Sequence, residues 1–216
     1  MRGRGDAVTI ELEPATRPTI HALRVAAADC RACPLWQRAT QTVFGAGDAR
    51  APLMLVGEQP GDEEDRQGRP FVGPAGRLLD EALAAAQIER ARTYVTNAVK
   101  HFKWAPSEGR GKRRLHEKPN ANEIRACRPW LLAEIEALRP RVVVCLGATA
   151  ARSLLGNAFR VTKQRGEVMA LESGPSAVAT IHPSAILRAP DHETRQREMR
   201  RFIADLAVAR ELLSPH

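Results

Sequence analysis

Short apolar runs alternate with amphipathic segments along most of the chain. Four runs are apolar or β-branched enough to be buried strands: 53–56, 93–96, 142–146 and 177–181. Apolar residues recur at helical spacing over 20–30, 74–86, 120–138, 147–155 and 192–213. Strands that alternate with helices favour parallel pairing, with helices on both faces of the sheet. The pattern therefore predicts a three-layer α/β/α fold with a central, mostly parallel, four-stranded sheet.

Length and periodicity together predict one domain. The chain has 216 residues, which suits a single hydrophobic core. Residues 1–18 lack periodicity, so we expect a flexible N-terminal arm there and one domain over residues 19–216. The longest apolar run, 142–146, is far shorter than the roughly 20 residues that span a bilayer. No signal-peptide pattern opens the chain, so we expect a cytoplasmic protein.

The chain is strongly basic, with a formal net charge of +8. A polyanion such as nucleic acid is the usual partner of so basic a domain, although an arginine-rich genome produces the same excess. The local distribution favours the first explanation, because residues 101–119 carry six lysines or arginines against two acids. Aromatic residues make up only 4% of the chain, which argues against a surface built on rows of stacked bases.

The four cysteines form one Cys-x-x-Cys pair and two later single positions. Four thiolates can hold an iron–sulfur cluster or a zinc ion. Zinc ribbons normally have two tight pairs, so the loose second pair favours a cluster. Inert buried thiols are the alternative, and disulfides would suit an exported chain. The predicted metal ligands are Cys30, Cys33, Cys127 and Cys145.

Polar residues follow three of the predicted strands. Because the carboxyl ends of parallel strands meet at one edge of a sheet, we expect Glu58, Asn97 and His182 to lie near one site. A carboxylate such as Glu58 can stabilise a developing cation, and His182 can donate to a developing anion. Helix capping by an acid of the Glu58 loop and a structural role for His182 are the simpler alternatives.

Phe71 and His116 each have two interpretations. Phe71 is either part of the core or a platform on which a planar ligand stacks. His116 lies in the basic segment, where it is a nucleophile, an acid/base group or a solvated histidine. The chain has no dinucleotide-binding, P-loop or serine-hydrolase motif, which leaves those functions without support.

Several ordered motifs resemble the uracil-DNA glycosylase superfamily, in its iron–sulfur, family-four-like branch. The resemblance covers about residues 19–213, and residues 112–116 are similar to an inserted loop of the UdgX subgroup. The other motifs, in chain order, are Gly57–Gly61, Gly68–Gly76, Thr96–Lys100 and His182–Ser184, together with the four cysteines.

The resemblance implies a uracil-DNA glycosylase-like fold, a [4Fe–4S] cluster on the four cysteines and a uracil base flipped into a pocket. In that pocket, Phe71 would stack on the base, Asn97 would read its edge and His182 would donate to the uracil oxygen that gathers charge. The remaining implied contacts are Gln59, Gly57 and Asp62 at the uracil and sugar, and Lys112, Arg113 and Arg114 at the DNA.

UdgX-type members keep the DNA after cleavage. Here His116 would attack C1′ of the sugar, with Glu58 orienting or deprotonating it, so that a single turnover leaves a covalent protein–DNA adduct. A multiple-turnover glycosylase that releases an unmodified abasic site is one alternative, and a non-catalytic, metal-stabilised nucleic-acid-binding module is another. We expect a bacterial, nucleoid-associated repair protein that is monomeric, prefers single-stranded uracil-containing DNA and has no membrane or protein partner.

Overall fold

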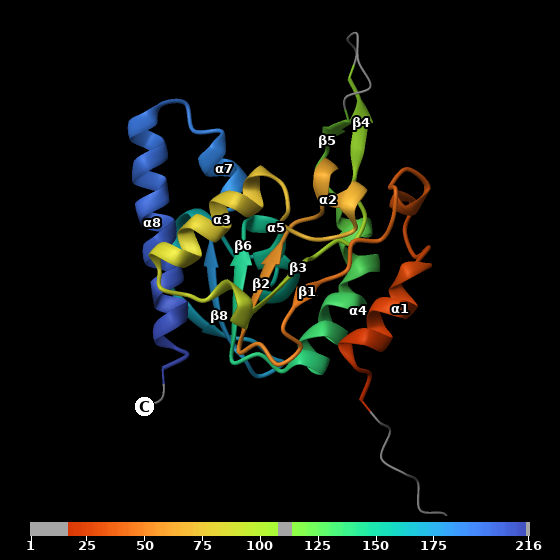
Figure 1. Cartoon of the computed structure of the whole chain (residues 1–216), viewed down its shortest axis with the longest axis horizontal. Helices are drawn as coiled ribbons and strands as arrows, with labels where there is room; N and C mark the ends of the chain where they lie inside the picture. The colour runs from red at the N-terminus through yellow and green to blue at the C-terminus, as the bar shows by residue number, and fades with distance from the viewer. Residues whose placement is uncertain (1–16, 108–113, 215–216) are drawn as a thin grey trace, which may run out of the picture.

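The fold is built on a six-stranded sheet with the strand order β1-β3-β2-β6-β8-β7 (Figure 1). The computed structural model describes residues 17–107 and 114–214. Its four middle strands are parallel and coincide with the predicted runs: β3 (Thr93–Asn97), β2 (Leu53–Gly57), β6 (Val142–Leu146) and β8 (Ser176–Thr180). The predicted α/β fold with its mostly parallel sheet is confirmed, but the sheet has six strands where four were predicted. Most of the expected N-terminal arm, residues 1–16, lies outside the described residues.

Helices cover both faces of the sheet. One face packs against α1 (Ile20–Ala28), α4 (Ala121–Leu138) and α5 (Ala148–Leu155). The other packs against α3 (Pro74–Ala85), α7 (Pro183–Leu187) and α8 (His192–Glu211). Shorter elements are α2 (Asp62–Gln67), α6 (Val161–Gln164) and 3₁₀ turns at Pro34–Gln37 and Arg90–Arg92. Within the described chain, no helix has the length and apolarity to cross a membrane.

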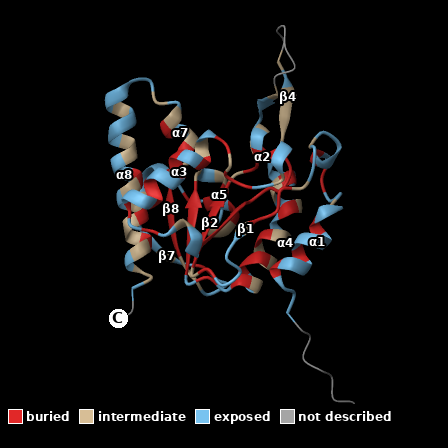
Figure 2. Cartoon of the chain, viewed as in Figure 1, coloured by how far each residue is buried: buried red, intermediate tan, exposed pale blue. Residues whose placement is uncertain are grey.

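Residue alternation along the strands explains the two-sided core. Leu53 and Leu55 pack toward α3 and α8, whereas Met54 and Val56 pack toward α4 and α5. Every residue of β2 is buried, as the continuous apolar run requires (Figure 2). Full burial of a leucine side chain contributes about 1.5–3 kcal/mol to the free energy of unfolding. The buried central strands therefore hold the residues at their carboxyl ends in fixed positions.

Short antiparallel pairs were not predicted. Strands β1 (Ala46–Gly47) and β7 (Val168–Ala170) extend the two edges of the sheet. Strands β4 (Trp104–Pro106) and β5 (Arg114–His116) form a separate hairpin, which projects from the carboxyl end of the sheet (Figure 1). Each has at most three residues, too few for an alternating pattern to emerge.

Candidate active site

A cavity of about 560 Å³ opens at the carboxyl ends of the parallel strands. Its lining includes predicted site residues from the ends of β2, β3 and β8, from the loop before α3 and from the hairpin. Six of them line it: Glu58, Gln59, Phe71, Asn97, His116 and His182.

Gly57 shapes the base of this cavity without lining it. A Cβ atom at Gly57 would lie 2.3 Å from Asn97 Oδ1 and 2.7 Å from Phe71 Cζ, so only glycine allows both side chains to approach. The Phe71 backbone has φ of 57°, a left-handed conformation that is costly for a large side chain. Its ring stacks against the His182 ring with centroids 6.0 Å apart. Strain and stacking together hold a flat apolar surface at the cavity wall.

His182 is held as a neutral hydrogen-bond donor. Its Nδ1 accepts the backbone N–H of Ser184 at 3.2 Å, which places the single ring proton of neutral imidazole on Nε2. Burial lowers the pKa of His182 to about 4, with smaller contributions from the nearby His116 and Arg188. At neutral pH the ring is therefore uncharged and can donate from Nε2.

Glu58 lies between a strand exit and the hairpin. The Thr149 hydroxyl donates a hydrogen bond to Glu58 Oε2, while Glu58 Oε1 lies 3.8 Å from His116 Nε2. The carboxylate is thus oriented by α5 on one side and faces the imidazole on the other. This arrangement can stabilise positive charge that develops between the two groups.

Gln59 attaches the hairpin to the sheet edge. Its side-chain amide donates to the carbonyls of Lys103 and Glu117, at 3.2 and 3.0 Å. The same nitrogen is 2.9 Å from His116 Nε2. Its two N–H groups can serve only two of these three acceptors at a time, so the Nε2 lone pair of His116 is not permanently engaged. Gln59 lines the cavity, and its expected contact with the base and sugar stays a prediction.

Burial lowers the pKa of His116, and the nearby Arg188 and Lys118 act in the same direction, whereas Glu58 raises it. The net effect keeps the ring neutral at pH 7, because the shift is downward from an ordinary value of 6.5. A neutral imidazole with its Nε2 lone pair facing the cavity can act as a nucleophile.

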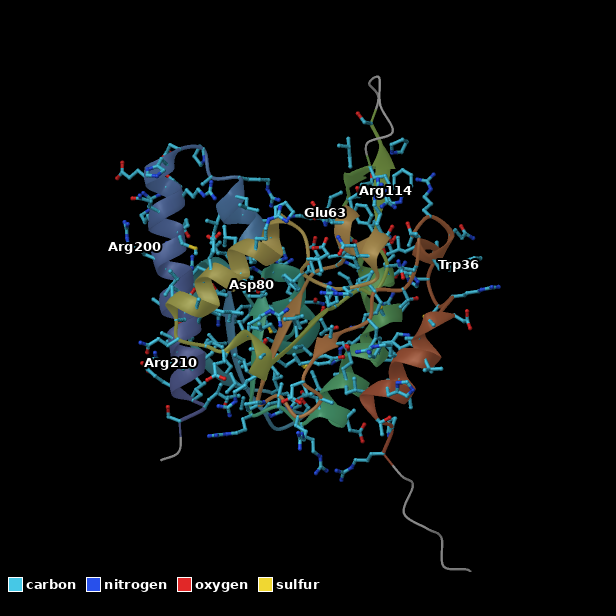
Figure 3. The ribbon with its side chains drawn as sticks, viewed as in Figure 1. Trp36, Glu63, Asp80, Arg114, Arg200 and Arg210 are labelled. Carbon is cyan, nitrogen blue, oxygen red and sulfur yellow. The ribbon has the colours of Figure 1, made fainter. Side chains whose placement is uncertain are left out.

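Arg114 was predicted to bind DNA, and in this structure its guanidinium pairs with two carboxylates instead of facing solvent. Its guanidinium bonds Asp62 and lies 2.5 Å from Asp65, whose carboxylate is fully buried. It also stacks over Phe102 and Trp104, with 5.2 and 5.5 Å to the ring centroids. Only 11% of the Arg114 side chain is exposed, so its charge is used within the protein (Figure 3). Lys112 and Arg113 lie outside the described residues.

Asp62 was predicted to contact substrate, and in this structure it pairs with two arginines. It begins α2 outside the cavity lining, and its carboxylate pairs with Arg66 at 3.1 Å and with Arg114. Arginine pairing therefore directs the Asp62 side chain toward α2 and the hairpin.

Sequence reasoning missed several residues of the cavity wall. Glu64 is the acid of the Glu58 loop that caps α2. It is buried and accepts the Gly61 and Gly73 N–H groups, which joins two cavity loops. Arg188 and Lys118 add positive charge at the rim. Arg188 lies one turn beyond the recognisable His182–Ser184 motif, and that position was the only available signal.

Three of the four cysteines lie within electrostatic reach of one another. Cys30 and Cys33 both raise the pKa of the Cys127 thiol, in addition to the larger effect of burial. The indole N–H of Trp130 contacts Cys30 Sγ at 3.2 Å, and the Lys100 backbone N–H contacts Cys127 Sγ at 3.2 Å. N–H donors directed at sulfur suit thiolate ligands.

Cys145 does not join this group. It lies on β6, fully buried in the sheet core beside Val56 and Ala179. Burial alone raises the pKa of Cys145 to about 12, without a contribution from another thiol. The predicted four-cysteine ligand set is therefore not assembled. Over residues 17–107 and 114–214, no three histidine, cysteine or acidic side chains are arranged to hold a metal.

The sequence was also compared with known families and proteins. The model of the uracil DNA glycosylase superfamily matches residues 44–207. A type-4 uracil-DNA glycosylase of Thermotoga maritima is 40% identical over 177 residues, 82% of this chain and 84% of that protein. One from Archaeoglobus fulgidus is 37% identical over 74% and 79% of the two chains. A type-5 uracil-DNA glycosylase of Pyrobaculum aerophilum is 32% identical over 65% and 64%.

Proposed function

Because this chain belongs to the uracil-DNA glycosylase superfamily, we propose that it excises uracil from DNA and then binds the abasic sugar covalently through His116. The excision step is supported by the family match and by the cavity residues. The capture step, typical of the UdgX subgroup, is supported by one observation. His116 lies in the cavity as a neutral imidazole, with Nε2 3.8 Å from Glu58 Oε1.

Uracil release requires stabilisation of the departing anion. The bond between C1′ and N1 breaks, and its electron pair leaves with the uracil ring. Neutral His182 donates from Nε2 to a uracil oxygen, and Asn97 hydrogen-bonds the base edge. Phe71 stacks on the ring. One well-placed donor of this kind accelerates a reaction by about 10²–10³-fold.

Capture uses the lone pair of His116 Nε2. It forms a new bond to C1′ as the sugar develops cationic character, and the positive charge passes to the imidazole ring. Glu58 stabilises this charge at close range. The ring loses its Nδ1 proton to solvent. The adduct persists because the imidazole bonded to C1′ becomes a neutral N-alkyl group once Nδ1 has lost its proton, and such a group is a poor leaving group.

A denaturing gel tests both steps. The protein is mixed with a labelled uracil-containing single strand, boiled in detergent and run beside a thymine strand and a His116→Ala sample. A uracil-dependent and His116-dependent band at the summed mass is expected. Loss of uracil without this band would identify a turnover glycosylase, with Glu58 aligning water. No reaction would favour a binding module. A duplex substrate tests the expected single-strand preference.

We also propose a structural iron–sulfur cluster on Cys30, Cys33 and Cys127. The three thiols are within electrostatic reach of one another but would have to draw closer to bind it. Its fourth ligand would be a side chain other than Cys145. The buried His101 is a chemically suitable alternative, since imidazole also ligates iron in clusters and His101 follows the residue whose N–H contacts Cys127. Four-thiolate ligation is not proposed.

Paired cysteine variants test the cluster. Cys127→Ala should abolish absorption near ~400 nm and the bound iron and sulfide, whereas Cys145→Ala should retain them. Cys145→Ala should lower the free energy of unfolding by about 1–2 kcal/mol, because it leaves a small cavity in the core. Loss of the chromophore in Cys145→Ala, in a protein that remains folded by circular dichroism, would contradict the three-cysteine assignment.

A further inference from the structure

A second groove adjoins the active-site cavity. It has a volume of about 880 Å³ and runs between the first half of α4 and α5. Glu58 and Lys118 line both hollows, so the groove lies directly beside the cavity where the sugar would lie. A strand whose flipped nucleotide fills the cavity can therefore reach the groove.

The groove is lined by four exposed cations. Arg125 and Arg128 lie one turn apart on α4, and Arg152 faces them from α5. Together with Lys118 they outnumber the two acids of the lining. None of these four cations forms an ion pair with a carboxylate of the described residues. Each is exposed, unlike Arg114.

Between the cations, the groove has an apolar surface. Ile124, Leu154 and Leu155 are partly buried in its lining. The Arg128 Nε donates to the Ser153 carbonyl at 3.0 Å, which fixes α4 against α5 and keeps the groove open. Fixed cations beside apolar patches suit a ligand that alternates phosphates with sugars and bases.

We propose that this groove binds the phosphodiester backbone of the DNA strand on one side of the flipped nucleotide. This proposal rests on the proposed function, which identifies the strand as uracil-containing DNA. Glu58 and Lys118 line both hollows and so place the groove beside the sugar. The proposal assigns the DNA contact to α4 and α5, rather than to the buried Arg114 of the hairpin. The groove cations on α4 and α5 are binding residues and stand outside the bond-breaking step, unlike Glu58 at the boundary with the cavity.

Binding is measured separately from catalysis with a single strand that carries 2′-fluorodeoxyuridine, whose glycosidic bond resists cleavage. The test variant is Arg125→Ala/Arg152→Ala. The control is Arg50→Ala/Arg200→Ala, which removes the same charge. Arg50 lies just before the amino end of β2, whereas the groove lies at the carboxyl end of the strands. Arg200, labelled in Figure 3, lies on α8, on the other face of the sheet from α4 and α5.

The test variant should bind about 20-fold more weakly at ~0.1 M salt, and its slope of log affinity against log salt should fall by about 1.4, the value for two phosphate contacts on a single strand. In the control variant, the loss of affinity and the fall in slope should each be less than half of those in the test variant. Equal losses in the test and control variants would overturn the proposal, because net charge alone would then explain the binding.

Neutral methylphosphonate links, placed one at a time on either side of the modified nucleotide, locate the groove along the strand. Wild-type protein should lose affinity for links on one side only, and Arg125→Ala/Arg152→Ala should lose no further affinity at those links. Additive losses would contradict the contact. A chain that binds in this way but releases no uracil from deoxyuridine would overturn the proposed function and support the groove.

Discussion

The two walls of the active-site cavity are built differently. Asn97 ends a fully buried central strand, and His182 is fixed by the first turn of α7. His116 instead lies on a three-residue strand of a projecting hairpin, and 46% of its side chain is exposed. The groups proposed to release the base thus belong to the fold core, whereas the proposed nucleophile belongs to an appended element. Release and capture should therefore be separable by mutation.

Removing His116 should separate the two steps most completely. His116→Ala should lower adduct formation by at least ~10³-fold, because the attacking lone pair is lost. Free uracil should still appear, within about tenfold of the wild-type single-turnover rate, since His182, Asn97 and Phe71 remain. The measurement is chromatography of released uracil beside a denaturing gel. A persistent heat-stable adduct would remove His116 from the proposed role.

Removing His182 should instead slow both steps together. His182→Ala should reduce uracil release and adduct formation by the same factor, about 10²–10³-fold, because capture follows departure of the base. Single-turnover rates at saturating DNA measure both, and binding of the 2′-fluoro strand serves as the control for folding of the pocket. If adduct formation fell while uracil release stayed fast, His182 would act in capture and not in release, which would contradict the proposal.

Acid should affect capture more than release. The pKa of His116 lies below its ordinary value, so the nucleophile is neutral above pH 7 and becomes protonated as the pH falls through the lowered value. Adduct formation should be flat from pH 7 to 8 and then fall about tenfold per pH unit below the His116 pKa. Uracil release by His116→Ala should lack this decline. Faster capture in acid would contradict a neutral nucleophile.

Loosening the hairpin should have the smallest effect. Arg114→Met keeps apolar contact with Phe102 but leaves Asp65 buried without its cation, which should reduce capture about tenfold and release less than threefold. Arg114→Met/Asp65→Asn should recover part of the loss. Equal loss of release and capture would show that Arg114 supports the whole cavity. A lower salt slope for DNA binding would restore its predicted role as a DNA contact.

The sheet could be predicted from the sequence, because its strands are continuous apolar runs separated by helical spacing. Glu58, Asn97 and His182 could be found for the same reason, since strand order brings strand ends together. Their chemical roles came from the family motifs.

The hairpin could not be predicted, because its contacts are distant in sequence. Arg114 pairs with Asp62 and Asp65, which lie about 50 residues earlier in the chain. From the sequence alone, the positive charge of Arg114 therefore looked available for DNA. The same limit explains Cys145. Spacing along the chain suggested a fourth ligand, whereas strand alternation in β6 places the thiol in the sheet core.

The chemical identity of the link to DNA tests the central claim most directly. Wild-type protein is reacted with a short uracil-containing strand, digested with protease and nuclease, and analysed by tandem mass spectrometry. We predict that the mass of the deoxyribose phosphate is attached to the imidazole of His116 and that the same position is unmodified with a thymine strand. Attachment at Glu58, or free uracil with no modified peptide, would contradict capture by the hairpin.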